Sequence, residues 1–240
     1  MRPILILVAL LALADCSYKQ RANAPLKATA FGAVIVESSG GKQIAPAGTL
    51  LPQPIVVQVN DQQGSAVTGA GVEFSGPGSV AFDPPSGTTD SSGQLTTNVT
   101  LGNGAGRYEL TASTYDKSHT KVDLKLEETA LDFQQVLGLK LNQQYCERCH
   151  NSESTPERVS NYDNLDVKPH AFTDGGYLNT MSDDDLAAII SHGGPALNKS
   201  AQMPPYGYTL SKSEIQALLA YIRAIADPPR SGRGLSYAQR

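Results

Sequence analysis

Residues 28–128 alternate apolar and polar side chains in short runs, which are separated by glycine, proline, asparagine, aspartate and serine. A period of two residues is typical of β-strands with one buried face, and the separating residues are typical of turns. The pattern predicts strands over residues 33–37, 55–60, 71–75, 79–82, 94–101, 107–114 and 120–126. Several short strands in one domain favour an all-β antiparallel sandwich.

From residue 129 onward the apolar side chains recur every three to four residues, which is the period of one face of an α-helix. This pattern predicts helices over residues 130–145, 182–192 and 211–226. The second and third helices begin at Ser182 and Ser211, and an acidic side chain follows each serine by three residues, as in a capping box. We therefore expect an all-α domain at residues 129–227 and a flexible tail at residues 228–240.

The first fifteen residues have the pattern of an export signal, with Arg2 before an apolar stretch at residues 4–14. This stretch is shorter than the ~20 residues of a permanent membrane helix. The sequence Leu-Ala-Asp-Cys at residues 13–16 resembles the lipobox of bacterial lipoproteins, which implies lipidation of Cys16. Asp15 departs from the small residue of that family, and an ordinary secretory signal is the alternative. Both interpretations place the protein outside the cytoplasm, with residues 16–27 as a polar tether.

Composition limits the possible partners. The chain has 240 residues, of which 18% are charged, and a formal net charge of -4. Because no concentrated run of lysine and arginine is present, we expect no nucleic-acid partner. No combination of nucleophile, base and orienting group stands out, which argues against an independent enzyme active site.

The sequence Cys-Glu-Arg-Cys-His at residues 146–150 is the motif for covalent attachment of haem c. Two residues between the cysteines allow both thiols to reach the vinyl groups of one porphyrin, while His150 turns toward the iron. A zinc site would usually need a second pair of ligands, and a thioredoxin-type pair would need a preceding strand where we expect a helix. We therefore predict that Cys146 and Cys149 hold one haem and that His150 binds its iron.

The side chains that could supply the sixth iron ligand are two methionines and three histidines: Met181, Met203, His119, His170 and His192. Met203 is the preferred candidate because the two prolines that follow it keep the backbone extended, so that a loop can reach across the haem. Met181 is explained by packing at a helix start, and His192 by its place at a helix end. His170 fits a surface or haem-edge residue, and His119 belongs to the β-rich region.

Residues 130–226 resemble a class I monohaem cytochrome c domain. The resemblance rests on the haem motif, on Met203 followed by two prolines, and on Gly138 and Tyr221, which match the crossing of the first and last helices in that family. It implies that His150 and Met203 are the axial ligands of one covalent haem c. The loop at residues 151–160 lacks the family's glycine-rich run. Whether the carbonyl of Pro156 or of Pro169 orients His150 is therefore open.

The β-rich region resembles bacterial immunoglobulin-like modules of the invasin type. Its characteristic segments are residues 56–61 with Gly64, residues 67–74, Thr89-Asp90 with Gly93, and residues 101–112. Such modules serve as spacers or adhesive units, so this resemblance implies a fold and names no partner.

Together these patterns predict a lipid-anchored electron carrier of the periplasm or cell surface, with redox proteins as its partners. Ser17 after the cysteine favours the outer membrane by analogy with lipoproteins. One alternative is a haem subunit of a larger exported oxidoreductase. Another is a surface adhesion or sensing protein with an accessory haem.

Overall fold

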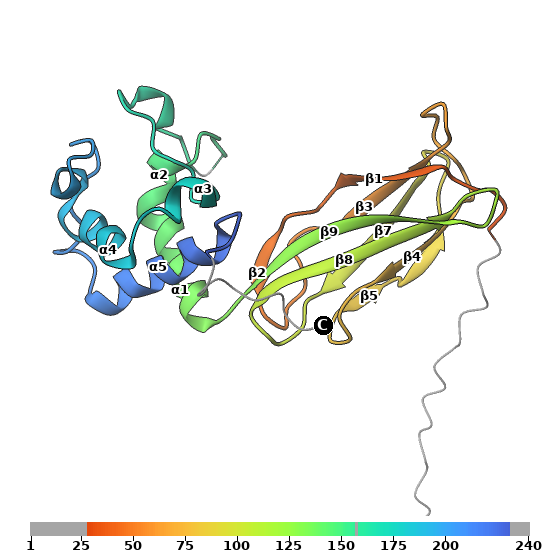
Figure 1. Ribbon diagram of the computed structural model, residues 1–240, viewed down its shortest axis with the longest axis horizontal. Helices are drawn as coiled ribbons and strands as arrows, with labels where there is room; N and C mark the ends of the chain where they lie inside the picture. The colour runs from red at the N-terminus through yellow and green to blue at the C-terminus, as the bar shows by residue number, and fades with distance from the viewer. Residues whose placement is uncertain (1–27, 157, 231–240) are drawn as a thin grey trace, which may run out of the picture.

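The computed structural model describes residues 28–156 and 158–230. The predicted signal peptide, Cys16, the tether and residues 231–240 of the predicted tail lie outside the described residues. The structure consists of a β-sandwich followed by a helical region, and the two lie end to end (Figure 1). This agrees with the predicted order of an all-β part and an all-α part.

The sandwich contains nine strands in two sheets. They are β1 (Val34–Ser39), β2 (Ile44–Pro46), β3 (Ile55–Asn60), β4 (Gly71–Ser75), β5 (Ala81–Asp83), β6 (Ser86–Thr88), β7 (Gln94–Thr100), β8 (Gly106–Tyr115) and β9 (Lys121–Leu131). One sheet has the order β1-β3-β7-β5 and the other the order β2-β9-β8-β4-β6. All seven predicted strands are present; β3 and β4 have the predicted ends, and the ends of the other five are shifted. The additional strands β2 and β6 have three residues each, too few to show an alternating pattern.

The alternation in β3 explains its position at the centre of the sandwich. Ile55, Val57 and Val59 are fully buried, while the residues between them are partly exposed. The expected antiparallel pairing holds for the other strand pairs of the described sandwich, but β2 pairs with β9 in parallel. Strand β9 continues to Leu131, past residue 128, where the sequence pattern placed the end of the β-rich region.

The helical region begins directly after β9. Its elements are α1 (Phe133–Leu141), the π-helical turn η1 (Asn142–Cys146), α2 (Glu147–His150), the turn η2 (Tyr162–Asn164), α3 (Gly175–Leu178), α4 (Asp183–His192), the turn η3 (Gly194–Leu197) and α5 (Lys212–Ile225). Helices α4 and α5 agree with the prediction, and both predicted serine caps form capping boxes. The first predicted helix starts later, because residues 130 and 131 belong to β9 and Asp132 caps α1.

Helices α1 and α5 cross at Gly138, which confirms the predicted contact with Tyr221. A Cβ atom on Gly138 would overlap the carbonyl oxygen of Ala217 and would lie 2.6 Å from Cβ of Tyr221. Only glycine permits this close approach of the two backbones. In the described part of the chain, no helix has both the length and the apolar character needed to cross a membrane.

Candidate functional site

The four predicted cofactor residues line one cavity inside the helical region. Cys146, Cys149, His150 and Met203 all border this space, whose volume is about 470 Å³. That volume lies within the range of roughly 300–1,000 Å³ that is usual for cofactor pockets. The rest of the wall is mainly apolar and comes largely from α4 and α5, through Leu186, Ile189, Ile190, Leu218 and Ile222.

The two cysteines lie on the turn formed by η1 and α2. A π-helical turn inside an α-helix is a frequent feature of functional sites, and here it places Cys146 at the end of η1. Asn142 Nδ2 donates a hydrogen bond to Glu147 Oε1 at 3.1 Å, and Arg158 Nε lies 3.4 Å from Glu147 Oε2. These contacts fix the first residue between the cysteines, and therefore the direction of the turn.

The cysteines are free thiols, and the cavity does not activate the first of them. Burial, with a smaller contribution from the charge of the nearby Glu147, raises the pKa of Cys146 to about 12. Reactive and zinc-binding cysteines instead have lowered pKa values, because the thiolate is the nucleophile and the metal ligand. Within the described residues, no three His, Cys, Asp or Glu side chains converge on a metal site.

His150 is held from two sides by the segment that precedes α3. Its ring stacks on Phe172 with centroids 4.4 Å apart and planes 21° apart. Its Nδ1 lies 3.5 Å from the carbonyl oxygen of His170. Burial lowers the pKa of His150, which favours the neutral imidazole that binds metals. With Nδ1 directed at a carbonyl, Nε2 remains as the metal-binding nitrogen.

The carbonyl that faces His150 corrects one expectation. Neither Pro156 nor Pro169 supplies it, because the oxygen belongs to His170, one residue beyond Pro169. Successive carbonyl groups outside a helix point in different directions, so a shift of one residue changes which oxygen faces the ring. The position of Pro169 in the sequence therefore located the segment but selected the wrong carbonyl.

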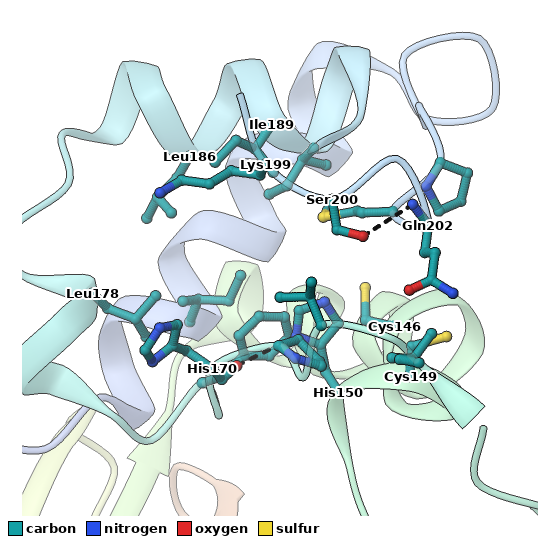
Figure 2. Close-up of a pocket in the computed structure, with 18 of the residues that line it drawn as sticks. Cys146, Cys149, His150, His170, Leu178, Leu186, Ile189, Lys199, Ser200 and Gln202 are labelled. Carbon is teal, nitrogen blue, oxygen red and sulfur yellow. Dashed lines mark hydrogen bonds between the residues drawn. The ribbon is translucent and has the colours of Figure 1, made fainter. Parts of the chain in front are cut away.

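Met203 lies in a loop that is fixed against the C-terminal end of α4. The amide of Gly194 donates to the carbonyl oxygen of Met203 at 3.1 Å, and the amide of Tyr206 donates to that of Ile190 at 2.9 Å. Ser200 and Gln202, from the same loop, lie across the cavity from His150 (Figure 2). The loop of Met203 and the imidazole of His150 therefore belong to opposite walls.

The other ligand candidates separate into two groups. His192 and His119 do not line the cavity; His192 ends α4, and His119 packs edge to face on Phe31 in the sandwich. Met181 and His170 do line it. His170 stacks on Tyr177 with centroids 3.5 Å apart, and its Nδ1 lies 3.1 Å from Asp174 Oδ2, so that one ring face and Nδ1 are already engaged.

Three aromatic residues near the site had no role predicted from the sequence. Phe172 stacks on His150, and Tyr206 donates a hydrogen bond through its hydroxyl to the carbonyl of Tyr145 at 3.0 Å. Tyr177 accepts a hydrogen bond from Lys199 Nζ at 3.1 Å. Phe172 and Tyr206 lie in loops and Tyr177 lies in α3, and no spacing in the sequence predicts these contacts.

Residues 136–222 match the family model of cytochrome c oxidase, cbb3-type, subunit III. This segment contains all four predicted cofactor residues. The helical region matches a cytochrome c domain. A domain of this type carries covalently bound haem c, and the haem motif lies inside the matched segment. No curated protein matches the chain.

Solved structures similar to this chain include bacterial adhesins. The D00-D0 domain of intimin is 18% identical with a TM-score of 0.33, and the match covers 44% of this chain and 52% of that one. The adhesin InvE of Yersinia pseudotuberculosis is 18% identical with a TM-score of 0.31, covering 41% of this chain and 32% of that one. Invasin, a bacterial integrin-binding protein, is 17% identical with a TM-score of 0.31, and the match covers 41% of this chain and 19% of that one. This chain thus spans about half of the first structure and less of the others, and the sandwich assignment rests on the strand pairing above.

The residues of the cavity fit a covalent haem. Two thiols lie beside each other on one turn, a neutral imidazole follows them directly, and a thioether belongs to the facing wall. The remaining wall is mainly apolar, which suits a porphyrin face. In the cytochrome c domain Cys146 and Cys149 would hold the group, and His150 and Met203 would bind its iron.

Proposed function

We propose that this protein is an exported, lipid-anchored monohaem cytochrome that transfers single electrons. The observation that carries the proposal is the shared cavity of Cys146, Cys149, His150 and Met203 in a domain that matches the cytochrome c family. When bound, haem supplies an iron that changes between the ferric and ferrous states. The single haem motif in the sequence supports one such group in each chain.

Each cavity residue has a defined task under this proposal. The two cysteines retain the cofactor through permanent thioether bonds, which suits a protein that works outside the cytoplasm. His150 offers a neutral nitrogen because burial disfavours its protonated form. Met203 would supply the second iron ligand, and its neutral sulfur would favour ferrous iron and so raise the reduction potential. With His150 and Met203 both bound, the iron would offer no open site to oxygen or peroxide, which supports electron transfer over catalysis.

A haem subunit of a larger exported oxidoreductase is the second candidate. The observation that favours it is the name of the matching family, a subunit of a cytochrome oxidase. In this alternative the sandwich docks the partner that performs the substrate chemistry, whereas in a free carrier it holds the haem away from the membrane. Co-purification of the tagged full-length protein with an oxidase or dehydrogenase would favour the subunit over the carrier.

The proposed ligands are tested by paired methionine variants of the full-length protein, produced with the machinery that attaches haem c. Wild type should carry the mass of one haem, show the far-red sulfur-to-iron band when oxidised, and refuse carbon monoxide when reduced. Met203→Ala should lose the band, bind carbon monoxide and have a lower reduction potential. Met181→Ala is the matched control because Met181 also lines the cavity, and it should behave like wild type. A colourless wild-type protein without added mass would refute the proposal.

The anchor needs a separate test, because Cys16 lies outside the described residues. We expect the mature protein to fractionate with membranes and to carry a lipid at Cys16. Cys16→Ser should release it to the soluble periplasmic fraction while leaving the haem spectrum unchanged. A wild-type protein that is soluble and lacks lipid would show an ordinary secretory signal.

A further inference from the structure

The sandwich and the helical region share a packed junction. Leu131, the last residue of β9, is 1% exposed and belongs to the apolar core of the helical region. Ile44 of β2, from the neighbouring strand, packs against the same core. Residues of β2 and β9 therefore pack against the helical region, which lies next to this end of the sandwich (Figure 1), and the junction is more than a covalent link.

Arg107 places a buried positive charge at this junction. It is 4% exposed and lies on β8 of the sandwich. Its Nη2 donates to the carbonyl oxygen of Ala226 at 2.6 Å, and its Nη1 contacts Glu127 and, at 3.4 Å, Asp227 Oδ1. Ala226 is the C-terminal cap of α5, where helix carbonyls lack partners within the helix and favour a positive charge.

The segment that Arg107 holds also supports the chain that precedes α3. The amide of Asp227 donates to the carbonyl oxygen of Thr173 at 2.9 Å, and the amide of Gly175 donates to that of Asp227 at 3.0 Å. A Cβ atom on Gly175 would overlap the carbonyl oxygen of Pro228. Residues 173–175 and 226–228 thus pack backbone against backbone.

The supported segment in turn contacts His150. Phe172, next to Thr173, stacks on the imidazole, and the carbonyl of His170 faces its Nδ1. Continuous contacts therefore run from β8 of the sandwich, through the end of α5, to the residue that we propose as the proximal iron ligand. Each contact involves main-chain atoms, a buried side chain or ring stacking. The two ends of this series of contacts therefore have little freedom to move relative to each other.

We propose that Arg107 is a positioning residue for the haem site: it fixes residues 226–228, which fix residues 170–175 and with them the orientation of the His150 imidazole. The sandwich is then a structural part of the redox centre and sets its geometry from outside the cytochrome c domain. This inference rests on the proposed role of His150 as an iron ligand. It adds that an adjoining domain, through one arginine, controls the direction of that ligand.

The experiment uses the full-length protein with its haem and compares Arg107→Ala, Arg107→Lys and Lys125→Ala. Lys125 is a matched control because it also pairs β8 with β9, through Glu109, on an exposed face away from the junction. Two measurements report on the proposed chain of contacts. Amide hydrogen exchange at Gly175 and Asp227 reports on the supported segment. The hyperfine-shifted NMR signals of the haem methyl groups report on the plane of the axial imidazole.

Arg107→Ala should accelerate exchange at both amides by about tenfold or more, and should redistribute the haem methyl shifts. Arg107→Lys keeps the charge but loses the forked geometry, so we expect a smaller change in the same direction. Lys125→Ala should match wild type in both measurements. If Arg107→Ala does not fold, Arg107→Lys and Gly175→Ala decide the question, and Gly175→Ala should reproduce the methyl shifts of a loosened segment.

A folded Arg107 variant with wild-type exchange rates and methyl shifts would overturn the inference. Failure of the proposed function looks different, because wild type itself would then lack haem or the spectrum of a histidine-ligated iron. The exchange measurement at Gly175 and Asp227 needs no haem signal, so it tests the contact with the sandwich in either case.

Discussion

The sandwich and the helical region build their apolar cores in different ways. In the sandwich, residues of β3 and β7 such as Val57 and Val99 are fully buried and belong to one apolar core. In the helical region, Leu186, Leu218 and Ile222 belong to the core and also to the wall of the cavity. We therefore expect the sandwich to be stable without a ligand, and the helical region to gain stability from what binds in the cavity.

Removal of the thiols should have the largest effect, and it should affect the helical region while leaving the sandwich unchanged. The double variant Cys146→Ala/Cys149→Ala cannot form thioether bonds, so we expect no haem to remain on the denatured chain. Loss of a bound cofactor destabilises by several kcal/mol through mass action. Hydrogen exchange should therefore become faster across α5 and remain as in wild type across β3.

His119→Ala is the control for this experiment, because His119 lies in the sandwich and does not line the cavity. It should keep its haem and its exchange pattern. Equal loss of protection in α5 and β3 in the thiol variant would contradict the comparison, since both regions would then unfold as one unit.

The difference between the regions also explains what the sequence could reveal. Repeated local signals were sufficient for β3, α4 and α5, because alternation, helical period and capping residues act over short distances. The haem motif gave three neighbouring site residues for the same reason. Strand β2 was not predicted, because it is three residues long and its parallel partner β9 lies far along the chain.

The surroundings of the site escaped the sequence because they depend on tertiary contacts. The carbonyl that faces His150 belongs to His170, twenty residues later, and nothing in the local pattern selects it over its neighbours. Arg107 shows the same limit more strongly. In the sequence it reads as a strand residue near a turn, and only the fold brings it to Ala226, 119 residues away.

The sandwich contains a buried carboxyl group, that of Glu128 in β9. Its side chain is fully buried, Oε2 accepts a hydrogen bond from the amide of Gln43 at 2.6 Å, and Oε1 has no partner among the described residues. Burial raises the pKa of Glu128 from 4.5 to about 8, and the charge of Glu37 adds to the rise. The folded state therefore binds this proton more strongly than the unfolded state does.

The sign of the pH dependence follows from that proton. The stability contributed by protonated Glu128 is fully present below about pH 4.5 and is lost as the pH rises through about 8. Denaturant unfolding of the sandwich should show a loss on the order of 5 kcal/mol between these limits, since one pKa unit corresponds to about 1.4 kcal/mol. Glu128→Gln should remove most of this dependence. Glu109→Gln, on the exposed face of the same hairpin, is the control, and parallel pH curves for wild type and Glu128→Gln would refute the assignment.

The crossing of α1 and α5 gives a smaller change that should be confined to the helical region. Gly138→Ala forces a Cβ atom against the backbone of Ala217, and such overpacking typically costs roughly 1–3 kcal/mol. Gly78→Ala is the control in the sandwich, because a Cβ atom there would meet no atom within 4 Å. Thermal unfolding followed at the haem absorbance should report a lower midpoint for Gly138→Ala alone. A midpoint equal to that of Gly78→Ala would mean that the two helices can move apart without loss of stability.

The smallest expected effect concerns the loop that carries Met203. Gly193 has a φ of 83°, and a Cβ atom there would lie 2.8 Å from the carbonyl oxygen of Met203. Gly193→Ala should weaken the hold on this loop by about 1.4 kcal/mol, which corresponds to a tenfold change in an equilibrium constant. Added imidazole should therefore displace the methionine at about one tenth of the wild-type concentration, measured by loss of the far-red band. Asn198→Gly, in the adjoining turn, adds no atom and should require the wild-type concentration. If Gly193→Ala also requires the wild-type concentration of imidazole, the position of Met203 is set by the cavity wall rather than by the end of α4.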